Sequence, residues 1–151
     1  MSPHLHCVVS KGVDVIDQLG ILQATLIAME EAASEVISLL QSSGISGPAY
    51  ALIDGPCNPK NMPCPSKPLV RGDNLSLSIA GASIIAKNKR DSIMNVLDAD
   101  WPEYGWCRNC GYGTPEHQRA LETHGLSPHH RRSFAPIRRL CGKATNKKEN
   151  F

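Results

Sequence analysis

The chain has 151 residues, of which 41% are hydrophobic and 20% are charged, and its formal net charge is +2. This composition excludes a wholly disordered protein, and the length suits one ordinary domain that needs no disulfide or metal for stability. No apolar run approaches the ~18 residues of a membrane span, and the amino end lacks the pattern of a signal peptide, so we expect an intracellular, cytoplasmic protein with no membrane partner.

The first predicted element is a long amphipathic helix over residues 16–40. Its apolar residues recur at alternating steps of three and four: Leu19, Leu22, Leu26, Met29, Ala33, Val36 and Leu40. Such a stripe is typical of a helix that packs against a core. The segment Ser42–Pro48 is predicted to end the helix, with Gly44 as a left-handed cap.

Two short strands are predicted next, and each ends in a carboxylate. Tyr50–Asp54 is almost wholly apolar, which favours a buried strand covered on both faces. Residues 56–68 contain five prolines and are predicted to form an irregular loop. Leu69–Asp73 is predicted as the second strand. Because ligands of α/β proteins bind at the carboxyl ends of strands, Asp54 and Asp73 are candidate site residues.

A second long helix is predicted over residues 76–99, with small residues in its first turns. Its inward positions are expected to be Ile79, Ala82, Ala86, Ile93 and Leu97. After this helix, the segment 104–113 is rich in glycine and aromatic residues and is predicted to be a loop.

A short helix is predicted between Thr114 and Gly125. Thr114 is a suitable N-cap and Pro115 suits the first helical position, while Gly125 ends the helix. The side chains of His117 and His124 are expected at the surface.

Positive charge gathers in the second half of the chain. Residues 1–75 carry four basic and seven acidic side chains, whereas residues 76–151 carry twelve basic and seven acidic ones. This asymmetry indicates either a nucleic-acid partner or a solvated basic surface. Arg131 and Arg132, in a dense basic segment, are candidate contacts to a phosphate backbone, as is Lys87 on the second helix; the alternative for all three is solvation of the surface.

Six cysteines occur in the chain, and without a secretory signal free thiols are favoured over disulfides. Cys107 and Cys110 have the C-x₂-C spacing of half a zinc site. No second pair has the matching spacing, so a zinc-binding module is the least favoured interpretation.

Five motifs stand in one order: Ala51–Gly55, Val70–Asp73, Ser78–Lys87 followed by Arg90–Asp91, Gly111–Thr114 and His130–Pro136. This series closely resembles type 2 ribonuclease H (ribonuclease HII), and the resemblance covers roughly residues 15–140. It implies an α/β fold with a ribonuclease H-like core and carboxyl-terminal helices. It also implies an endonuclease that cleaves the RNA strand of RNA–DNA hybrids, or DNA containing ribonucleotides, with two Mg²⁺ or Mn²⁺ ions.

The resemblance assigns roles to three residues of this sequence. Asp54 and Asp73 match two of the catalytic, metal-binding carboxylates, and hard oxygen ligands suit Mg²⁺ or Mn²⁺. Tyr112 matches the tyrosine that contacts the ribose 2′-hydroxyl, the group that distinguishes RNA from DNA.

Two departures from the family pattern stand out. Asn109-Cys110 replaces the His-Lys pair before Gly-Tyr, which is expected to loosen contacts to phosphate. No Asp-Glu followed by Gly-Arg-Gly occurs, and His6–Ser10 leaves room for only one strand before the first helix.

We therefore expect residues 1–142 to form a domain truncated at its amino end, with two of the four metal carboxylates, and residues 143–151 to be a disordered polar tail. An active nuclease and an inactive nucleic-acid-binding module both remain open.

Overall fold

In the computed structural model, which describes residues 5–138, the segment predicted as one helix over residues 16–40 forms two. α1 (Val13–Leu19) ends at Gly20, whose φ of 79° is a conformation that favours glycine. α2 (Ile21–Ser42) then continues the apolar pattern. The prediction of a single helix is therefore wrong. The prediction rested on the apolar periodicity, and a single glycine does not interrupt that pattern. Gly44 has a φ of 73°, which confirms the predicted cap.

The chain divides into two compact units. The first comprises Met1–Lys11 and Leu22–Lys89, and the second comprises Gly12–Ile21 and Arg90–Phe151. The domain boundary at residue 142 stays a prediction, and the predicted tail 143–151 lies outside the described residues. Within residues 5–138, no helix combines the length and apolar character that crossing a membrane requires.

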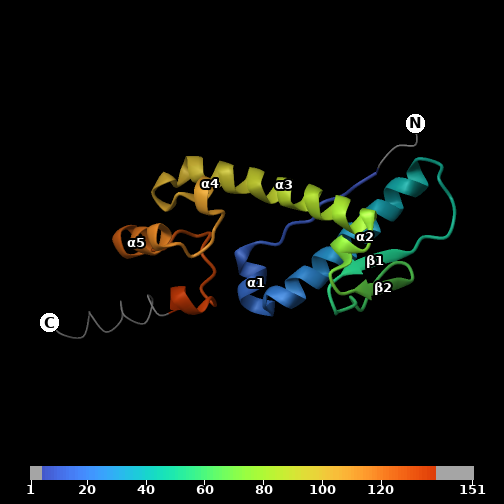
Figure 1. Ribbon diagram of the computed structural model, residues 1–151, viewed down its shortest axis with the longest axis horizontal. Coiled ribbons are helices and arrows are strands. Elements are labelled where there is room, and N and C mark those ends of the chain that lie inside the picture. The colour runs from blue at the N-terminus through green and yellow to red at the C-terminus, as the bar shows by residue number, and fades with distance from the viewer. Residues whose placement is uncertain (1–4, 139–151) are drawn as a thin grey trace. The chain divides into compact units, whose positions relative to one another are not determined.

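The first unit contains a small parallel sheet of two strands, β1 (Ala51–Asp54) and β2 (Ser66–Leu69), which lie side by side in Figure 1. Ala51 pairs with Ser66, and Asp54 pairs with Leu69. Together with the helices this sheet confirms the α/β class. β1 lies where it was predicted, but Ile53 is 7% exposed and Leu52 is 40% exposed, so the prediction that both faces are covered is wrong.

The second strand begins three residues earlier and ends four residues earlier than predicted, so it includes the end of the predicted loop 56–68. β2 ends at Leu69, and Asp73 lies in the short helix η1 (Gly72–Asn74) instead of at a strand end. The physical reason is Arg71, whose φ of 56° is left-handed and incompatible with an extended strand.

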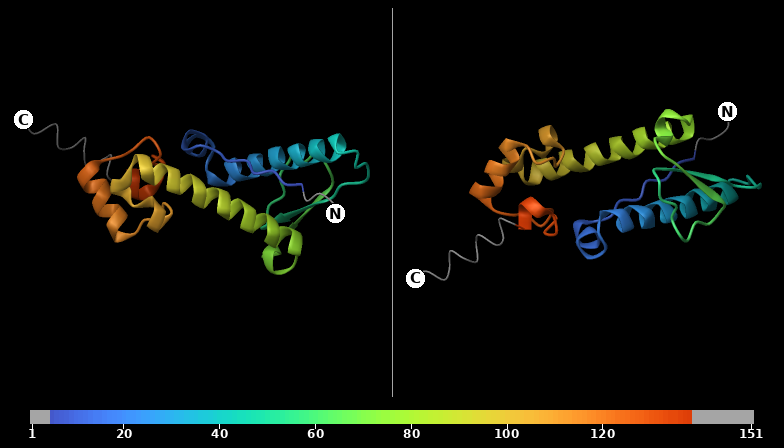
Figure 2. Two further views of the ribbon diagram at one scale, coloured as in Figure 1. Left: turned by 90° about the horizontal axis from the view of Figure 1, so that it is seen from above. Right: turned by 60° about the horizontal axis from the view of Figure 1, so that its bottom comes forward.

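α3 (Leu77–Asp100) is one continuous helix, as Figure 2 shows, and it confirms the helix predicted over residues 76–99. Ile79 is buried, and Ile93 and Leu97 are half-buried. Ala82 and Ala86 are exposed, so their predicted inward placement is wrong.

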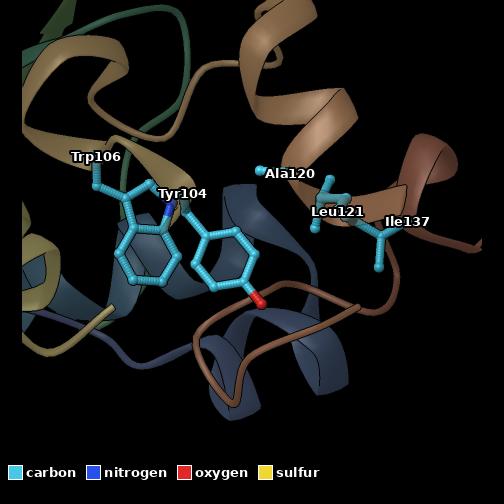
Figure 3. Packing of buried hydrophobic residues seen from close by; sticks show 5 residues of the cluster. All are labelled: Tyr104, Trp106, Ala120, Leu121 and Ile137. Carbon is cyan, nitrogen blue, oxygen red and sulfur yellow. The ribbon is translucent and has the colours of Figure 1, made fainter. Parts of the chain in front are cut away.

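The second unit is built around the segment that was predicted to be a loop. It forms η2 (Pro102–Tyr104) and α4 (Trp106–Asn109), which place two aromatic rings in the core. The rings of Tyr104 and Trp106 stack with centroids 5.1 Å apart, and Tyr104 is 1% exposed. Figure 3 shows these rings together with the other buried members of the cluster, Ala120, Leu121 and Ile137. An aromatic pair of this kind contributes about 0.5–1.5 kcal/mol beyond its buried area.

α5 (Pro115–His124) confirms the predicted short helix and its caps. The Oγ1 of Thr114 accepts a hydrogen bond from the backbone N–H of His117 (3.2 Å), and Gly125 has a φ of 78°. The phenol of Tyr104 donates to the carbonyl oxygen of Gly125 (3.1 Å), which ties the end of α5 to the aromatic core.

Candidate metal site and nucleic-acid interface

Asp54 and Asp73 lie at the carboxyl end of the small sheet in the first unit. Asp54 is the last residue of β1, and its Oδ1 accepts a hydrogen bond from the backbone N–H of Gly72 (2.9 Å). Asp73 follows Gly72 directly in the chain. The hydrogen bond therefore fastens the turn that carries Asp73 to the end of β1.

Gly72 makes this close approach feasible. A Cβ atom at this position would lie 2.5 Å from Cδ1 of Ile79 and 3.4 Å from Oδ1 of Asp54. Ile79 is 5% exposed and packed in the core, so it has little room to yield. The Arg-Gly-Asp sequence thus has a structural explanation, in which Arg71 supplies the turn and Gly72 the close contact.

The chemistry of the two carboxylates suits a hard cation. Oδ1 of Asp73 accepts hydrogen bonds from the backbone N–H (3.0 Å) and the Nδ2 (3.4 Å) of Asn74. In both aspartates Oδ1 thus accepts hydrogen bonds from nearby residues of the same chain. Each carboxylate has a second oxygen of the kind that binds Mg²⁺ or Mn²⁺. Within residues 5–138, no group of three or more His, Cys, Asp and Glu side chains is placed to hold a metal ion. Two carboxylates could supply only part of the ligand set of one ion, and metal binding by Asp54 and Asp73 stays a prediction.

Tyr112 lies in the second unit, on the turn between α4 and α5. Its side chain is 70% exposed. The carbonyl of Tyr112 accepts a hydrogen bond from the backbone N–H of Thr114 (2.8 Å), and that of Gly113 accepts one from Nε2 of Gln118 (3.1 Å). The turn thus holds its backbone through α5 while it presents the phenol to solvent.

Comparison with known proteins identifies the family. The model of the ribonuclease HII family matches residues 7–137, which include Asp54, Asp73 and Tyr112. The chain belongs to the ribonuclease HII family. It is 49% identical over 125 residues to the ribonuclease HII of Magnetococcus marinus, 47% identical over 129 residues to that of Rhodospirillum rubrum and 49% identical over 127 residues to that of Halorhodospira halophila.

These alignments cover unequal shares of the two partners. They include 83%, 85% and 84% of this chain but only 56%, 55% and 62% of the respective relatives. The chain thus spans little more than half the length of the ribonuclease HII proteins that it matches.

The three basic residues that were predicted to contact phosphate lie in different parts of the chain. Lys87 lies on α3 in the first unit with an exposed side chain. In the second unit, the guanidinium of Arg131 lies 5.1 Å from the ring centroid of Phe134, and the side chain of Arg132 is exposed. Contacts from these residues to phosphate stay predictions.

Asp17 on α1 holds the basic segment, a role that sequence analysis missed. Its Oδ2 accepts from the backbone N–H of Arg132 (2.8 Å), and its Oδ1 accepts from that of Ser133 (3.1 Å). The hydroxyl of Ser133 and these backbone groups keep the pKa of Asp17 below its usual value. No local signal reveals the contact, because the partners are 115 and 116 residues apart.

Sequence analysis also missed a buried histidine pair, His117 and His130. Their rings stack with centroids 5.3 Å apart, and they are 5% and 7% exposed. The expected surface position of His117 is therefore wrong, because its Nδ1 reaches the carbonyl of Tyr104 (3.2 Å) inside the core. His124 is exposed, as expected.

The structure offers no support for zinc at Cys107 and Cys110. The five cysteines in the described part of the chain have free thiols. The thiol of Cys107 is hydrogen-bonded to Asp98, and this contact raises the pKa of Cys107. Because zinc binds the thiolate, a raised pKa opposes binding.

Proposed function

We propose that this chain carries part of the active site of an endonuclease that cleaves the RNA strand of RNA–DNA hybrids, or DNA containing ribonucleotides. The observation that carries the proposal is the hydrogen bond from Gly72 to Asp54, which fastens the turn bearing Asp73 to the end of β1. Two carboxylates at one sheet end, in a member of the ribonuclease HII family, suit a divalent cation.

Each proposed role follows from the chemistry of the side chain. Asp54 and Asp73 would hold Mg²⁺ or Mn²⁺, and such ions stabilise the attacking and leaving oxygens of phosphodiester hydrolysis when they are bound. The Tyr112 phenol can both donate and accept a hydrogen bond, as can the ribose 2′-hydroxyl that it would contact. Lys87, Arg131 and Arg132 would position the backbone through its phosphates.

We further propose that the 151-residue chain alone cleaves its substrate very poorly or not at all. A two-ion site needs more ligands than Asp54 and Asp73 supply, and the described residues place no third one beside them. Groups that act as one catalytic unit lose several orders of magnitude in rate when some are absent. The same observation favours the second candidate function, hybrid binding without cleavage.

A pair of duplexes tests both parts of the proposal. One is an all-DNA duplex, and the other has the same sequence with a single ribonucleotide. The chain should bind the ribonucleotide duplex more tightly and cleave it at a barely measurable rate in Mg²⁺ or Mn²⁺. Asp54→Asn and Asp73→Asn should abolish any cleavage, whereas Asp100→Asn, an exposed aspartate at the end of α3, should not change it.

Two results would contradict the proposal. Equal affinity for both duplexes would refute ribose recognition. Rapid cleavage that survives Asp54→Asn and Asp73→Asn would show that other residues form the site, whereas rapid cleavage that these substitutions abolish would refute only the proposed inactivity.

A further inference from the structure

The turn that carries Tyr112 is held from its amino-terminal side by one buried residue, Asn109. Asn109 is the last residue of α4 and is 6% exposed. Its Oδ1 accepts a hydrogen bond from the backbone N–H of Gly111 (2.8 Å), and its carbonyl oxygen accepts one from the backbone N–H of Tyr112 (2.8 Å). Both backbone groups that lead into the exposed phenol therefore bond to the same residue.

The other end of the Asn109 amide is anchored in the aromatic core. Its Nδ2 donates to the carbonyl oxygen of Tyr104 (2.7 Å), which also lies 3.2 Å from Nδ1 of His117. Because a carbonyl oxygen only accepts, Nδ1 of His117 carries a proton in this arrangement. Asn109 thus connects the turn to Tyr104, the most deeply buried large side chain among the described residues.

The backbone after Asn109 follows an unusual path. Cys110 has a φ of 49°, which is uncommon for a residue other than glycine, and Gly111 has a φ of 78°. The guanidinium of Arg90 donates to the carbonyl of Cys110 (2.8 Å), and a Cβ atom at position 111 would lie 3.3 Å from Cε of Met94. A turn of this shape persists only where neighbouring groups hold it.

We infer that Asn109 is a positioning residue for ribose recognition: it holds the Tyr112 backbone so that the phenol is oriented before a nucleic acid arrives. This inference rests on the proposed contact of Tyr112 with the 2′-hydroxyl. Ordering a flexible turn during binding would reduce the affinity gained, and a turn ordered beforehand avoids that loss. The amide of Asn109 is buried and bonded within the core, and the sequence-based expectation that Asn109-Cys110 loosens contacts to phosphate stays a prediction.

The first experiment measures the turn without nucleic acid. Amide hydrogen exchange at Gly111 and Tyr112 should be much faster in Asn109→Ala than in the parent chain, because Gly111 loses its acceptor. Asn95→Ala, which removes an exposed asparagine of α3, is the matched control and should leave both rates unchanged. Unchanged protection in Asn109→Ala would overturn the inference.

The second experiment measures the affinity ratio between the ribonucleotide duplex and the all-DNA duplex. Asn109→Ala should lower this ratio by roughly two- to tenfold, the equivalent of one lost hydrogen bond, in chains shown to be folded by tryptophan fluorescence. Tyr112→Phe should lower it similarly, and the double variant should lower it no further. If Asn109→Ala loses amide protection but keeps the parent's affinity ratio, the positioning role is overturned. If Tyr112→Phe still lowers the ratio in that case, the proposed function remains supported. An unchanged ratio in Tyr112→Phe would instead refute the proposed ribose contact, and with it the inference.

Asn109→Asp decides the matter within a single folded protein if Asn109→Ala fails to fold. A protonated carboxyl has one donor and one acceptor, the same pair that the amide uses here, whereas a carboxylate has no donor for the Tyr104 carbonyl. The variant should therefore approach the parent's affinity ratio at low pH and lose it as the pH rises. Because protonation of the buried His130 also destabilises this unit at low pH, the parent chain is measured at each pH and the ratio is compared only where both chains are folded. A ratio in Asn109→Asp that follows the parent's at every pH would contradict the role of the amide donor.

Discussion

Acidification should destabilise the second unit through the protonation of one buried histidine. The reason is His130, whose pKa burial lowers from the ordinary 6.5 to about 4, with a smaller contribution from neighbouring His117. Nδ1 of His130 accepts a hydrogen bond from the backbone N–H of Ser127 (3.0 Å). Protonation at Nδ1 would remove this acceptor, and it would place a charge against the rings of Tyr104 and His117.

The sign and size of the effect follow from linkage. The unfolded chain binds a proton at the histidine below pH 6.5, whereas the folded chain does so only near pH 4, so stability falls as the pH decreases through this window. With about 1.4 kcal/mol per pKa unit, the loss is about 2 kcal/mol between pH 7.5 and pH 5 and about 3 kcal/mol by pH 4. Such a loss is a large part of the stability of a small domain.

Urea unfolding at several pH values measures this loss. The two tryptophans of the chain, Trp101 and Trp106, both lie in the second unit, so their fluorescence reports its unfolding. His130→Gln should flatten the dependence of the unfolding free energy between pH 7.5 and pH 5, and His124→Gln, at an exposed site, should not. A parent chain with equal stability at both pH values, confirmed by circular dichroism, would refute the reasoning.

Two substitutions test other contacts. Gly72→Ala should destabilise the first unit by about 1–3 kcal/mol, because the new methyl overlaps Ile79; unchanged thermal unfolding would contradict the close packing. Asp17→Asn should speed amide exchange at Arg132 and Ser133, whereas Asp14→Asn, also on α1, should not. Because the pKa of Asp17 is lowered in the folded chain, the contribution of its carboxylate to stability is present at neutral pH and is lost as the pH falls below 3.8. Slow exchange of both amides in Asp17→Asn would argue against the contact.

Local signals predicted the caps of two helices and the end of β1, but they misplaced the second strand and missed the break in the first helix. The Thr114 cap and the Gly44 cap depend on residues within one turn of the helix, and both are confirmed. The break at Gly20 and the left-handed Arg71 are backbone choices that leave the apolar pattern intact. The observed elements therefore differ from the predicted ones at these two positions, although the apolar periodicity that was used to place the elements is unchanged there.

The candidate site residues could be named from the sequence, but the groups that hold them could not. Asp54 follows an apolar run and Asp73 follows the segment that was predicted as the second strand; the structure shows the turn that carries Asp73 bonded to Asp54 at the end of β1, and the metal-binding role of both residues stays a prediction. Asn109, His117 and His130 act through long-range burial, which a single sequence does not display. Polar residues in a glycine-rich stretch resemble surface loop residues until the aromatic core around them is known.

Binding of Mn²⁺ to the chain, followed by electron paramagnetic resonance, tests the central claim most directly, because it requires neither a substrate nor catalytic activity. The account predicts one weak site that is lost in Asp54→Asn and in Asp73→Asn and retained in Asp100→Asn. Binding that survives both of the first two substitutions, or no binding by the parent chain at any concentration of Mn²⁺ tested, would contradict the proposal that these two aspartates share a divalent ion.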